Sequence, residues 1–392
     1  MVRALIFLSI ILLYGLLNYW IGMRLWQLAG KFIPHVTASL YWLVFWLVVL
    51  SFLAGRLCER YVNYKIGQPL ILLGSYWMAA MVYLAIILGL LELVRLADKR
   101  LTFLPRGAYE QFPTAPLIGF SVLIIVIVII GYGWWNARIP HIIHYDINIP
   151  KQAGSIKQLH VVAVSDLHLG NTVHNKRLQG LVEMVNGLNP DIILLPGDIV
   201  DEDPMPFIEQ NMGHTLRKLA PRYGIYAVPG NHEYIGGRWV EIINGLEKAG
   251  VNVLQDEVIK VADSFYVVGR DDLYSRYYTN NKRSDLQTIV QGIDKALPVI
   301  AIDHQPVNLS EPEEQGVDLQ ISGHTHRGQF FPFNIVTARI FEIDRGYLRK
   351  ENLQVIVSTG FGTWGPPVRI GSQSEILDIV INFNSPAGKS PS

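Results

Sequence analysis

The segment Leu159–His168 reads LHVVAVSDLH, an apolar run rich in valine that ends in polar residues, among them Asp166 and His168. Such a run is typical of a strand buried on both faces, and the polar residues then lie at its carboxyl end. A stretch with helical spacing, Lys176–Leu188, and another apolar run, Ile192–Pro196, follow it. Strands that alternate with helices predict an α/β fold.

Four later apolar runs also end in polar residues. Ligand sites in open α/β sheets lie at the carboxyl ends of strands, so side chains from five strand ends are expected to meet. An Asp or Asn after a strand can also be only a turn former or a helix cap. Five of the 11 histidines fall in these groups, however, which favours a site. The four later groups are Gly197-Asp198, Gly230-Asn231-His232-Glu233, Asp303-His304 and Gly323-His324-Thr325-His326.

The order of these groups resembles the pattern of the calcineurin-like metallophosphoesterases, over about residues 158–384. The resemblance implies a four-layer α/β/β/α sandwich and two divalent metal ions. Carboxylates, imidazoles and an amide suit Mn, Fe or Zn. Carried over by motif, the ligands of one metal are Asp166, His168 and His326, those of the other are Asn231, His304 and His324, and Asp198 bridges the two.

The resemblance also implies hydrolysis of a phosphate ester or anhydride by a metal-activated hydroxide, without a protein nucleophile. His232 is similar to the family's leaving-group histidine, which protonates the departing alkoxide or stabilises the phosphoryl oxygens. A structural histidine beside the ligand Asn231 is the alternative. Glu233 is expected to support the ligands. Arg327 is a candidate for phosphate binding, with a solvated surface arginine as the alternative.

The end of the chain resembles one branch of the family. The segment Val357–Arg369, VSTGFGTWGPPVR, followed by Glu375, is similar to the end of its membrane-anchored bacterial branch. That branch includes proteins similar to the UDP-2,3-diacylglucosamine hydrolases, and also the animal transmembrane protein with a metallophosphoesterase domain. Two residues depart from the pattern, because Arg327 stands where Gly is usual and Ser374 where Pro is common. Neither is a predicted metal ligand.

The first 150 residues differ from the rest in charge and texture. The chain of 392 residues is 50% hydrophobic and only 17% charged. Residues 1–150 carry 11 Lys/Arg and 5 Asp/Glu, whereas residues 151–392 carry 22 and 28. A domain boundary is therefore predicted near Pro150. The single cysteine, Cys58, excludes a disulfide framework and a zinc site built on thiolates, and the net charge of zero gives no indication of nucleic-acid binding.

Four uncharged stretches in residues 1–150 are long enough to cross a bilayer, about 4–23, 36–55, 66–91 and 116–135. A cleaved signal peptide is an alternative for the first stretch alone. A soluble bundle is disfavoured because Val122–Ile130 is apolar on every side. No charged residue lies within these stretches, so an anchor is favoured over a transporter or channel. We expect a membrane domain over 1–150, a catalytic domain over 151–384 and a flexible tail over 385–392.

An anchor of this kind predicts a multi-pass protein of the cell membrane, with membrane lipid as a partner. It also predicts a lipid-linked phosphorylated substrate, because tethering concentrates the enzyme where that substrate lies. A narrower alternative is a UDP-2,3-diacylglucosamine-type diphosphatase of lipid A synthesis. An alternative of another class is a non-catalytic metal-binding sensor. No nucleic-acid partner is expected.

The charges around the last stretch bear on the side of the membrane that the catalytic domain faces. Counted over all the segments that flank the four stretches, six Lys and Arg residues lie on the side of the catalytic domain and six on the other side. Four of them, however, lie in Arg95–Arg106 before the last stretch, whereas Arg138 alone lies within ten residues after Trp135. The positive-inside rule then predicts a cytoplasmic Arg95–Arg106 loop and an extracytoplasmic catalytic domain.

Overall fold

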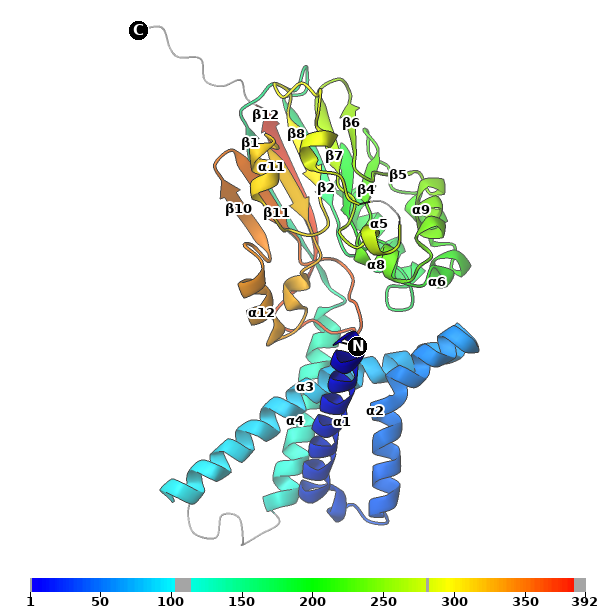
Figure 1. Cartoon of the computed structure of the whole chain (residues 1–392), viewed down its shortest axis with the longest axis vertical. Coiled ribbons are helices and arrows are strands. Elements are labelled where there is room, and N and C mark those ends of the chain that lie inside the picture. Colours follow the sequence, from blue (N-terminus) through cyan, green and yellow to red (C-terminus); the bar gives the residue numbers. More distant parts are fainter. Residues whose placement is uncertain (1, 103–113, 280–281, 384–392) are drawn as a thin grey trace. The chain divides into compact units, whose positions relative to one another are not determined.

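The computed structural model of the chain describes residues 2–102, 114–279 and 282–383 (Figure 1). It divides into a helical unit, Met1–Trp134 with Gly365–Val368, and an α/β unit, Trp135–Trp364 with Arg369–Ser392. The predicted tail over 385–392 lies outside the described residues.

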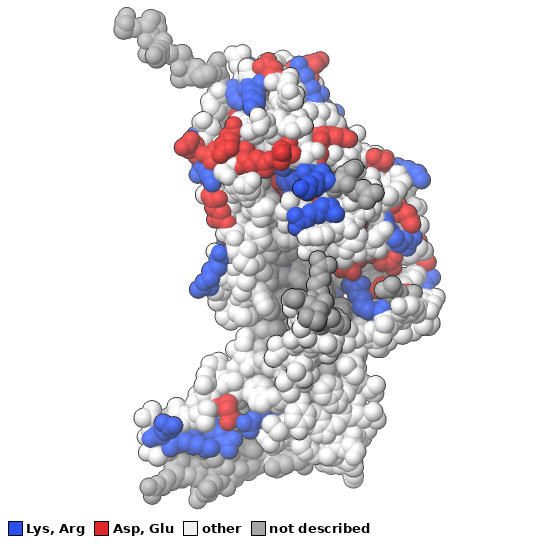
Figure 2. Space-filling model, in the orientation of Figure 1, with Lys and Arg blue, Asp and Glu red and all other residues white. Residues whose placement is uncertain are grey.

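In the described part of the helical unit, four α-helices are apolar and long enough to cross a membrane, as predicted. The third continues beyond the predicted end at residue 91, and its last turn carries Lys99 and Arg100. Figure 2 shows that the surface of these helices is otherwise largely free of charged side chains. The elements are α1 (Val2–Leu28), the 3-10 turn η1 (Gly30–Phe32), α2 (Ala38–Tyr61), α3 (Tyr64–Leu101) and α4 (Thr114–Asn136).

Helices α2 and α3 approach each other closely at Gly74. A Cβ atom there would lie 2.3 Å from the backbone nitrogen of Phe52, so only glycine fits. Small residues at such crossings allow membrane helices to pack by van der Waals contact, since lipid supplies no hydrophobic driving force between them.

The first sheet of the α/β unit has six strands in the order β1-β12-β2-β3-β4-β5. Strands β2 to β5 pair in parallel, whereas β12 runs antiparallel to β2 and parallel to β1. The strands are β1 (Pro140–Ile149), β2 (Gln158–Ala163), β3 (Ile192–Pro196), β4 (Ile225–Val228), β5 (Val251–Val253) and β12 (Ser374–Phe383), and the helices are α5 (Asn175–Gly187), α6 (Met205–Glu209), α7 (Met212–Leu216), α8 (Asn231–Ile235) and α9 (Trp239–Lys248).

The second sheet also has six strands, in the order β10-β11-β9-β8-β7-β6. Its four inner strands are parallel, and the two edge strands, β6 and β10, are antiparallel to their neighbours. The strands are β6 (Glu257–Val261), β7 (Phe265–Gly269), β8 (Val299–Ile302), β9 (Leu319–Ser322), β10 (Gly346–Lys350) and β11 (Leu353–Val357), and the helices and turns are η2 (Ser275–Tyr277), α10 (Leu286–Ile289), α11 (Ser310–Glu314), η3 (His326–Gly328) and α12 (Phe333–Ile340).

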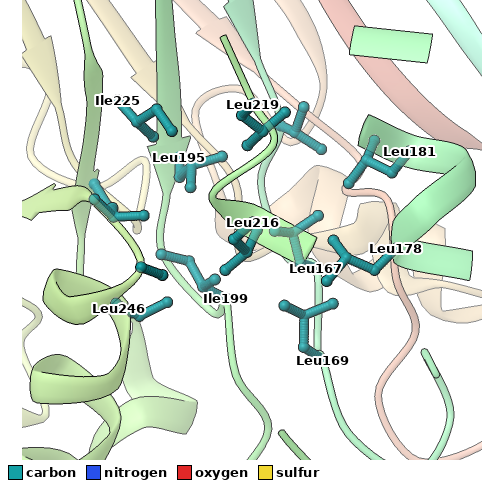
Figure 3. Packing of buried hydrophobic residues seen from close by; sticks show 14 of the residues in the cluster. Leu167, Leu169, Leu178, Leu181, Leu195, Ile199, Leu216, Leu219, Ile225 and Leu246 are labelled. Atoms are coloured by element: carbon teal, nitrogen blue, oxygen red, sulfur yellow. The ribbon is translucent and has the colours of Figure 1, made fainter. Parts of the chain in front are cut away.

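Alternation along the strands produces the predicted α/β/β/α layers. Successive side chains of a strand point to opposite faces of its sheet. In β2, Val161 packs in the core shared by the two sheets, whereas Val162 packs with Leu178 and Leu181 of α5 (Figure 3). On the outer face of the second sheet, residues of β8 pack with Leu286 of α10.

The α/β unit begins earlier than the boundary predicted near Pro150. Strand β1, Pro140–Ile149, is an edge strand of the first sheet and pairs residue for residue with β12. Its partner β12 lies more than two hundred residues away in sequence. The charge and hydropathy of residues 140–149 alone therefore do not show that β1 belongs to the sheet.

Candidate metal centre

The five polar groups lie at the carboxyl ends of strands from both sheets. Strands β2, β3 and β4 lead to Asp166, Asp198 and Asn231, and strands β8 and β9 lead to His304 and His324. The parallel direction of these strands brings their ends to one edge. The stacking of the two sheets then brings the two edges together.

One group of possible ligands consists of Asp166, His168 and His326, whose ligand atoms all lie within 4.8 Å of one another. The Nε2 atom of His326 lies 3.4 Å from Asp166 Oδ1 and 3.2 Å from His168 Nε2. All three side chains are buried. This is the set that the sequence motifs assign to one metal.

A second group consists of Asp198, His304 and His324, again within 4.8 Å of one another. His304 Nε2 lies 3.3 Å from Asp198 Oδ2 and 3.2 Å from His324 Nδ1. The same Nε2 atom lies 3.2 Å from the amide oxygen of Asn231. The structure therefore places Asn231 beside His304, one of the two histidines that the sequence motifs pair with it.

Asp198, a member of the second group, also approaches the first. Its Oδ2 atom, which approaches His304, also lies 3.8 Å from His168 Nε2 in the other group. Its Oδ1 atom accepts a hydrogen bond from the backbone N–H of His232 at 2.9 Å, which fixes the carboxylate. One carboxylate oxygen is thus shared by two sets of donors.

The pKa values of two histidines of the site favour metal binding, whereas against the effect of burial Asp198 raises the pKa of His304 well above its ordinary value. Burial lowers the pKa of His324 to about 3, and it lowers the pKa of His326 well below its ordinary value. Neutral imidazoles keep a lone pair for a metal. Burial also raises the pKa of Asp166, because a charged carboxylate is costly in the interior. A bound cation would remove that cost, so these residues fit divalent metal ions.

The ligand loops adopt unusual backbone conformations. Asp166, His168, Asp198, His324 and His326 all have positive φ, between 45° and 69°. Non-glycine residues rarely occupy this region, and such strain is concentrated at functional sites. The surrounding hydrogen bonds therefore hold these side chains in place at a conformational cost.

Glu233 fastens two of these loops together. Its carboxylate accepts hydrogen bonds from the backbone N–H groups of Asp198 and Gly230, at 3.0 and 2.7 Å, and from that of Val200 at 2.8 Å. Burial raises the pKa of Glu233 to about 7, with the nearby charge of Asp198 adding to the effect. The side chain thus orients the loops of Asp198 and Asn231.

His232 lies at the edge of the site with a carboxylate of its own. Its Nδ1–H donates to Asp201 Oδ1 at 3.0 Å. Burial alone would lower the pKa of His232, but Asp198 and Asp201 raise it to about 10, so the imidazole carries a proton near neutral pH. His168, Asp198 and His232 also lie close enough to hold a metal ion, so a ligand role for His232 is geometrically possible as well.

Comparison with known proteins identifies the family. The model of the calcineurin-like phosphoesterases matches residues 159–328. An uncharacterized metallophosphoesterase of Aquifex aeolicus is 31% identical over 226 residues, which are 57% of this chain and 85% of that protein. The chain belongs to the calcineurin-like metallophosphoesterases. The resemblance of its sequence motifs to that family is thereby confirmed.

Longer relatives also match. A protein of Danio rerio named transmembrane protein with metallophosphoesterase domain is 33% identical over 273 residues, which are 66% of this chain and 61% of that protein. The chain thus spans about three fifths of the length of that relative. A crystal structure of a dimetal phosphatase from Danio rerio covers 58% of this chain and 99% of its own, with 13% identity and a TM-score of 0.36.

In this metallophosphoesterase, two residues near the ligands were not predicted from the sequence. Asp201 is followed by two more acidic residues and so looks like an exposed turn. Arg369 is fully buried, lies 3.2 Å from His326 Nδ1, and donates to the carbonyls of Gly360 and Gly362. Arginine is ordinarily exposed, and the sequence alone does not show that Arg369 is buried beside the site.

The structure places Arg327 apart from these contacts. It directly follows His326, and its Nη1 donates to the carbonyl oxygen of Gly371 at 3.0 Å. A role of Arg327 in phosphate binding therefore stays a prediction from the sequence.

Gly197 offers a test of how tightly the site is packed. It has φ of +78°, and a Cβ atom there would lie 2.5 Å from His304 Nδ1, the atom that donates to the Pro196 carbonyl. We expect Gly197→Ala to destabilise the protein by about 1–3 kcal/mol and to weaken metal binding. Thermal unfolding of the full chain in detergent and its metal content measure the two effects.

Gly180→Ala is the matched control, because nothing lies within 4 Å of a Cβ at this position in α5. Alanine there should leave the unfolding temperature unchanged or raise it, since alanine favours a helix over glycine. Equal unfolding temperatures for Gly197→Ala and the unchanged protein would contradict the close contact with His304.

Proposed function

We propose that this chain is a membrane-bound phosphoesterase that uses two divalent metal ions to hydrolyse a phosphate ester or anhydride. The observation that carries the proposal is the position of Asp198, whose Oδ2 lies between two groups of buried ligand atoms. Such an arrangement suits two cations that share one carboxylate.

Asp166, His168 and His326 would hold one ion, Asn231, His304 and His324 the other, and Asp198 would bridge them. Oxygen and imidazole donors suit Mn, Fe or Zn, and no thiolate lies in the set. Two ions bound there would polarise a phosphoryl oxygen and lower the pKa of water, which supplies a nucleophile at neutral pH. Glu233 and Arg369 would hold the ligand loops in position through their hydrogen bonds to backbone groups.

His232 would act as the general acid. Its proton is held by Asp201 on the Nδ1 side, which leaves the Nε2–H group of the imidazolium to donate to a leaving oxygen. The hydrogen bond to the Asp201 carboxylate favours the protonated form of this ring. Asp201 would orient the ring without touching the substrate.

The membrane helices support a lipid-linked substrate, since tethering raises the local concentration of enzyme at the bilayer. Within this class, a UDP-2,3-diacylglucosamine-type diphosphatase is a narrower alternative, and a panel of lipid phosphodiesters and nucleotide-linked lipids separates the two. A non-catalytic sensor is disfavoured, because every ligand residue of the family pattern is present in this chain.

We expect Asp198→Ala to lose both the metal ions and the activity, because it removes the only ligand that the two groups share. Metal content by mass spectrometry, together with hydrolysis of bis(p-nitrophenyl) phosphate, checks this. Full activity of the unchanged protein after chelation and removal of all metal would contradict the proposal.

We expect His232→Gln to keep the metal ions but to slow turnover by about 10²–10⁴-fold, the usual contribution of general acid–base catalysis. Substrates with good leaving groups should be slowed less, because they need less protonation. Asp201→Asn should slow turnover less than His232→Gln does, and it should likewise affect substrates with poor leaving groups most. Loss of metal from His232→Gln would instead identify His232 as a ligand.

We further propose that the α/β unit faces the extracytoplasmic side. Four spanning helices would put the N-terminus and the α/β unit on one side, and the basic residues at the end of α3 favour a cytoplasmic position for the following loop. Arg106, which contributes to that count, lies outside the described residues.

Protease added to spheroplasts should then cleave residues 151–392 before lysis. Complete protection until the cells are lysed would reverse the orientation. That result would also favour the nucleotide-linked lipid, whose precursor is made in the cytoplasm.

A further inference from the structure

Helix α12 presents apolar side chains to the outside of the α/β unit. None of its residues is buried, although most of its sequence, FNIVTARI, is apolar. We call the exposed group Phe331, Phe333, Ile335, Val336 and Ile340 the α12 surface; its members are 41–69% exposed. Phe333, Val336 and Ile340 are three and four residues apart, so they lie on one face of α12. Exposed apolar patches mark interaction sites. The surface over α12 is also drawn mostly white, without acidic side chains, in Figure 2.

The α12 surface is joined to the metal centre at the N-terminal end of the helix. The chain runs from the ligand His326 through Gln329 into Phe333, the first residue of α12. The N–H of Phe331 donates to the Ile370 carbonyl at 2.7 Å, and the N–H of Ile370 donates to the Gln329 carbonyl at 3.1 Å. The first turn of α12 is therefore fixed relative to the ligand loop.

The C-terminal half of α12 is tied to the same loop. Thr325, which lies between the ligands His324 and His326, donates its hydroxyl hydrogen to the Asp344 carbonyl at 2.6 Å. Thr337 of α12 donates to the Asp344 carboxylate at 2.7 Å. Both ends of α12 are therefore hydrogen-bonded, directly or through Asp344, to the segments that carry the candidate ligands.

The charge of α12 and the short link between α4 and the α/β unit indicate that the partner of the α12 surface is a lipid bilayer. Helix α12 contains Arg339, which is exposed, and no acidic residue. Apolar helices with basic side chains bind the interface of bilayers that contain anionic lipid. Helix α4, apolar enough to span a membrane, ends at Asn136, and β1 begins at Pro140. A link this short spans about 3.3–3.6 Å per residue at most, so the α/β unit is held beside the bilayer.

We propose that the α12 surface inserts into the lipid–water interface and is a second membrane contact besides the spanning helices. The α12 surface would hold the ligand loop at the level of the lipid headgroups. Resting on the proposed function, this contact would let the phosphoryl group of a membrane lipid reach the metal centre without leaving the bilayer. The substrate would then be a lipid that carries its phosphate in the headgroup.

The test uses the full chain in vesicles of phosphatidylcholine and phosphatidylglycerol. In a Cys58→Ser background, which removes the single native cysteine, Val336→Cys carries an environment-sensitive fluorophore. Val240→Cys on α9 is the matched control, because Val240 is 50% exposed and Val336 is 49% exposed. Brominated lipids should quench the probe at position 336 and leave the probe at position 240 unchanged.

Two results would overturn the lipid contact. Absence of quenching at position 336 with a blue-shifted emission would show that protein covers the surface, either the chain's own helices or a second copy. Equal quenching at positions 336 and 240 would show that the α/β unit has no preferred lipid-facing side. Neither result depends on turnover, so both are independent of the proposed function.

The link to the substrate is tested with Val336→Glu and Val240→Glu. Val336→Glu should lower hydrolysis of vesicle-borne lipid phosphodiesters about tenfold or more, because the local concentration at the bilayer falls. It should leave hydrolysis of soluble bis(p-nitrophenyl) phosphate unchanged, and Val240→Glu should change neither rate. Equal loss on both substrates would contradict delivery by α12. No hydrolysis of either substrate by the unchanged protein would contradict the proposed function, while the quenching result alone decides the lipid contact.

Discussion

A buried carboxylate between two sets of imidazoles is the constraint on which the rest of the site depends. Asp198 lies at the end of β3 with its Oδ2 facing His168 on one side and His304 on the other. Although burial opposes ionisation, His304 and His232 hold the pKa of Asp198 well below its usual range. A negative charge in the interior requires compensation, and the surrounding donors are arranged so that cations can supply it.

The site is held together by groups that do not themselves belong to the ligand set. Glu233 binds the backbone of the Asp198 loop, and Arg369 binds the carbonyls of the loop that follows β11. The Glu233 carboxylate accepts hydrogen bonds from backbone N–H groups, and the Arg369 guanidinium donates hydrogen bonds to backbone carbonyls. Such paired restraints explain how several residues with positive φ persist around the centre, since the neighbouring structure determines their conformations.

The helical unit and the proposed lipid contact of the α12 surface would together bring the site to the membrane. The four long helices are apolar enough to span a membrane, and α12 is an apolar element that is continuous with the candidate ligand loop. In a soluble phosphoesterase, an exposed apolar helix beside the active centre would be a liability for aggregation. In a protein that stays at a bilayer, the same helix has a place to bury its side chains.

Local patterns in the sequence were enough to predict the types, order and strand-end positions of the candidate ligands, and the four long apolar helices. This is so because buried strands and membrane helices leave local patterns in the chain. Three features could be seen only in the folded chain: β1 joins the first sheet, Asp201 accepts a hydrogen bond from His232, and α12 is exposed. These features depend on contacts between segments that are distant in the sequence. An apolar residue looks the same in the sequence whether it is buried by another element or exposed.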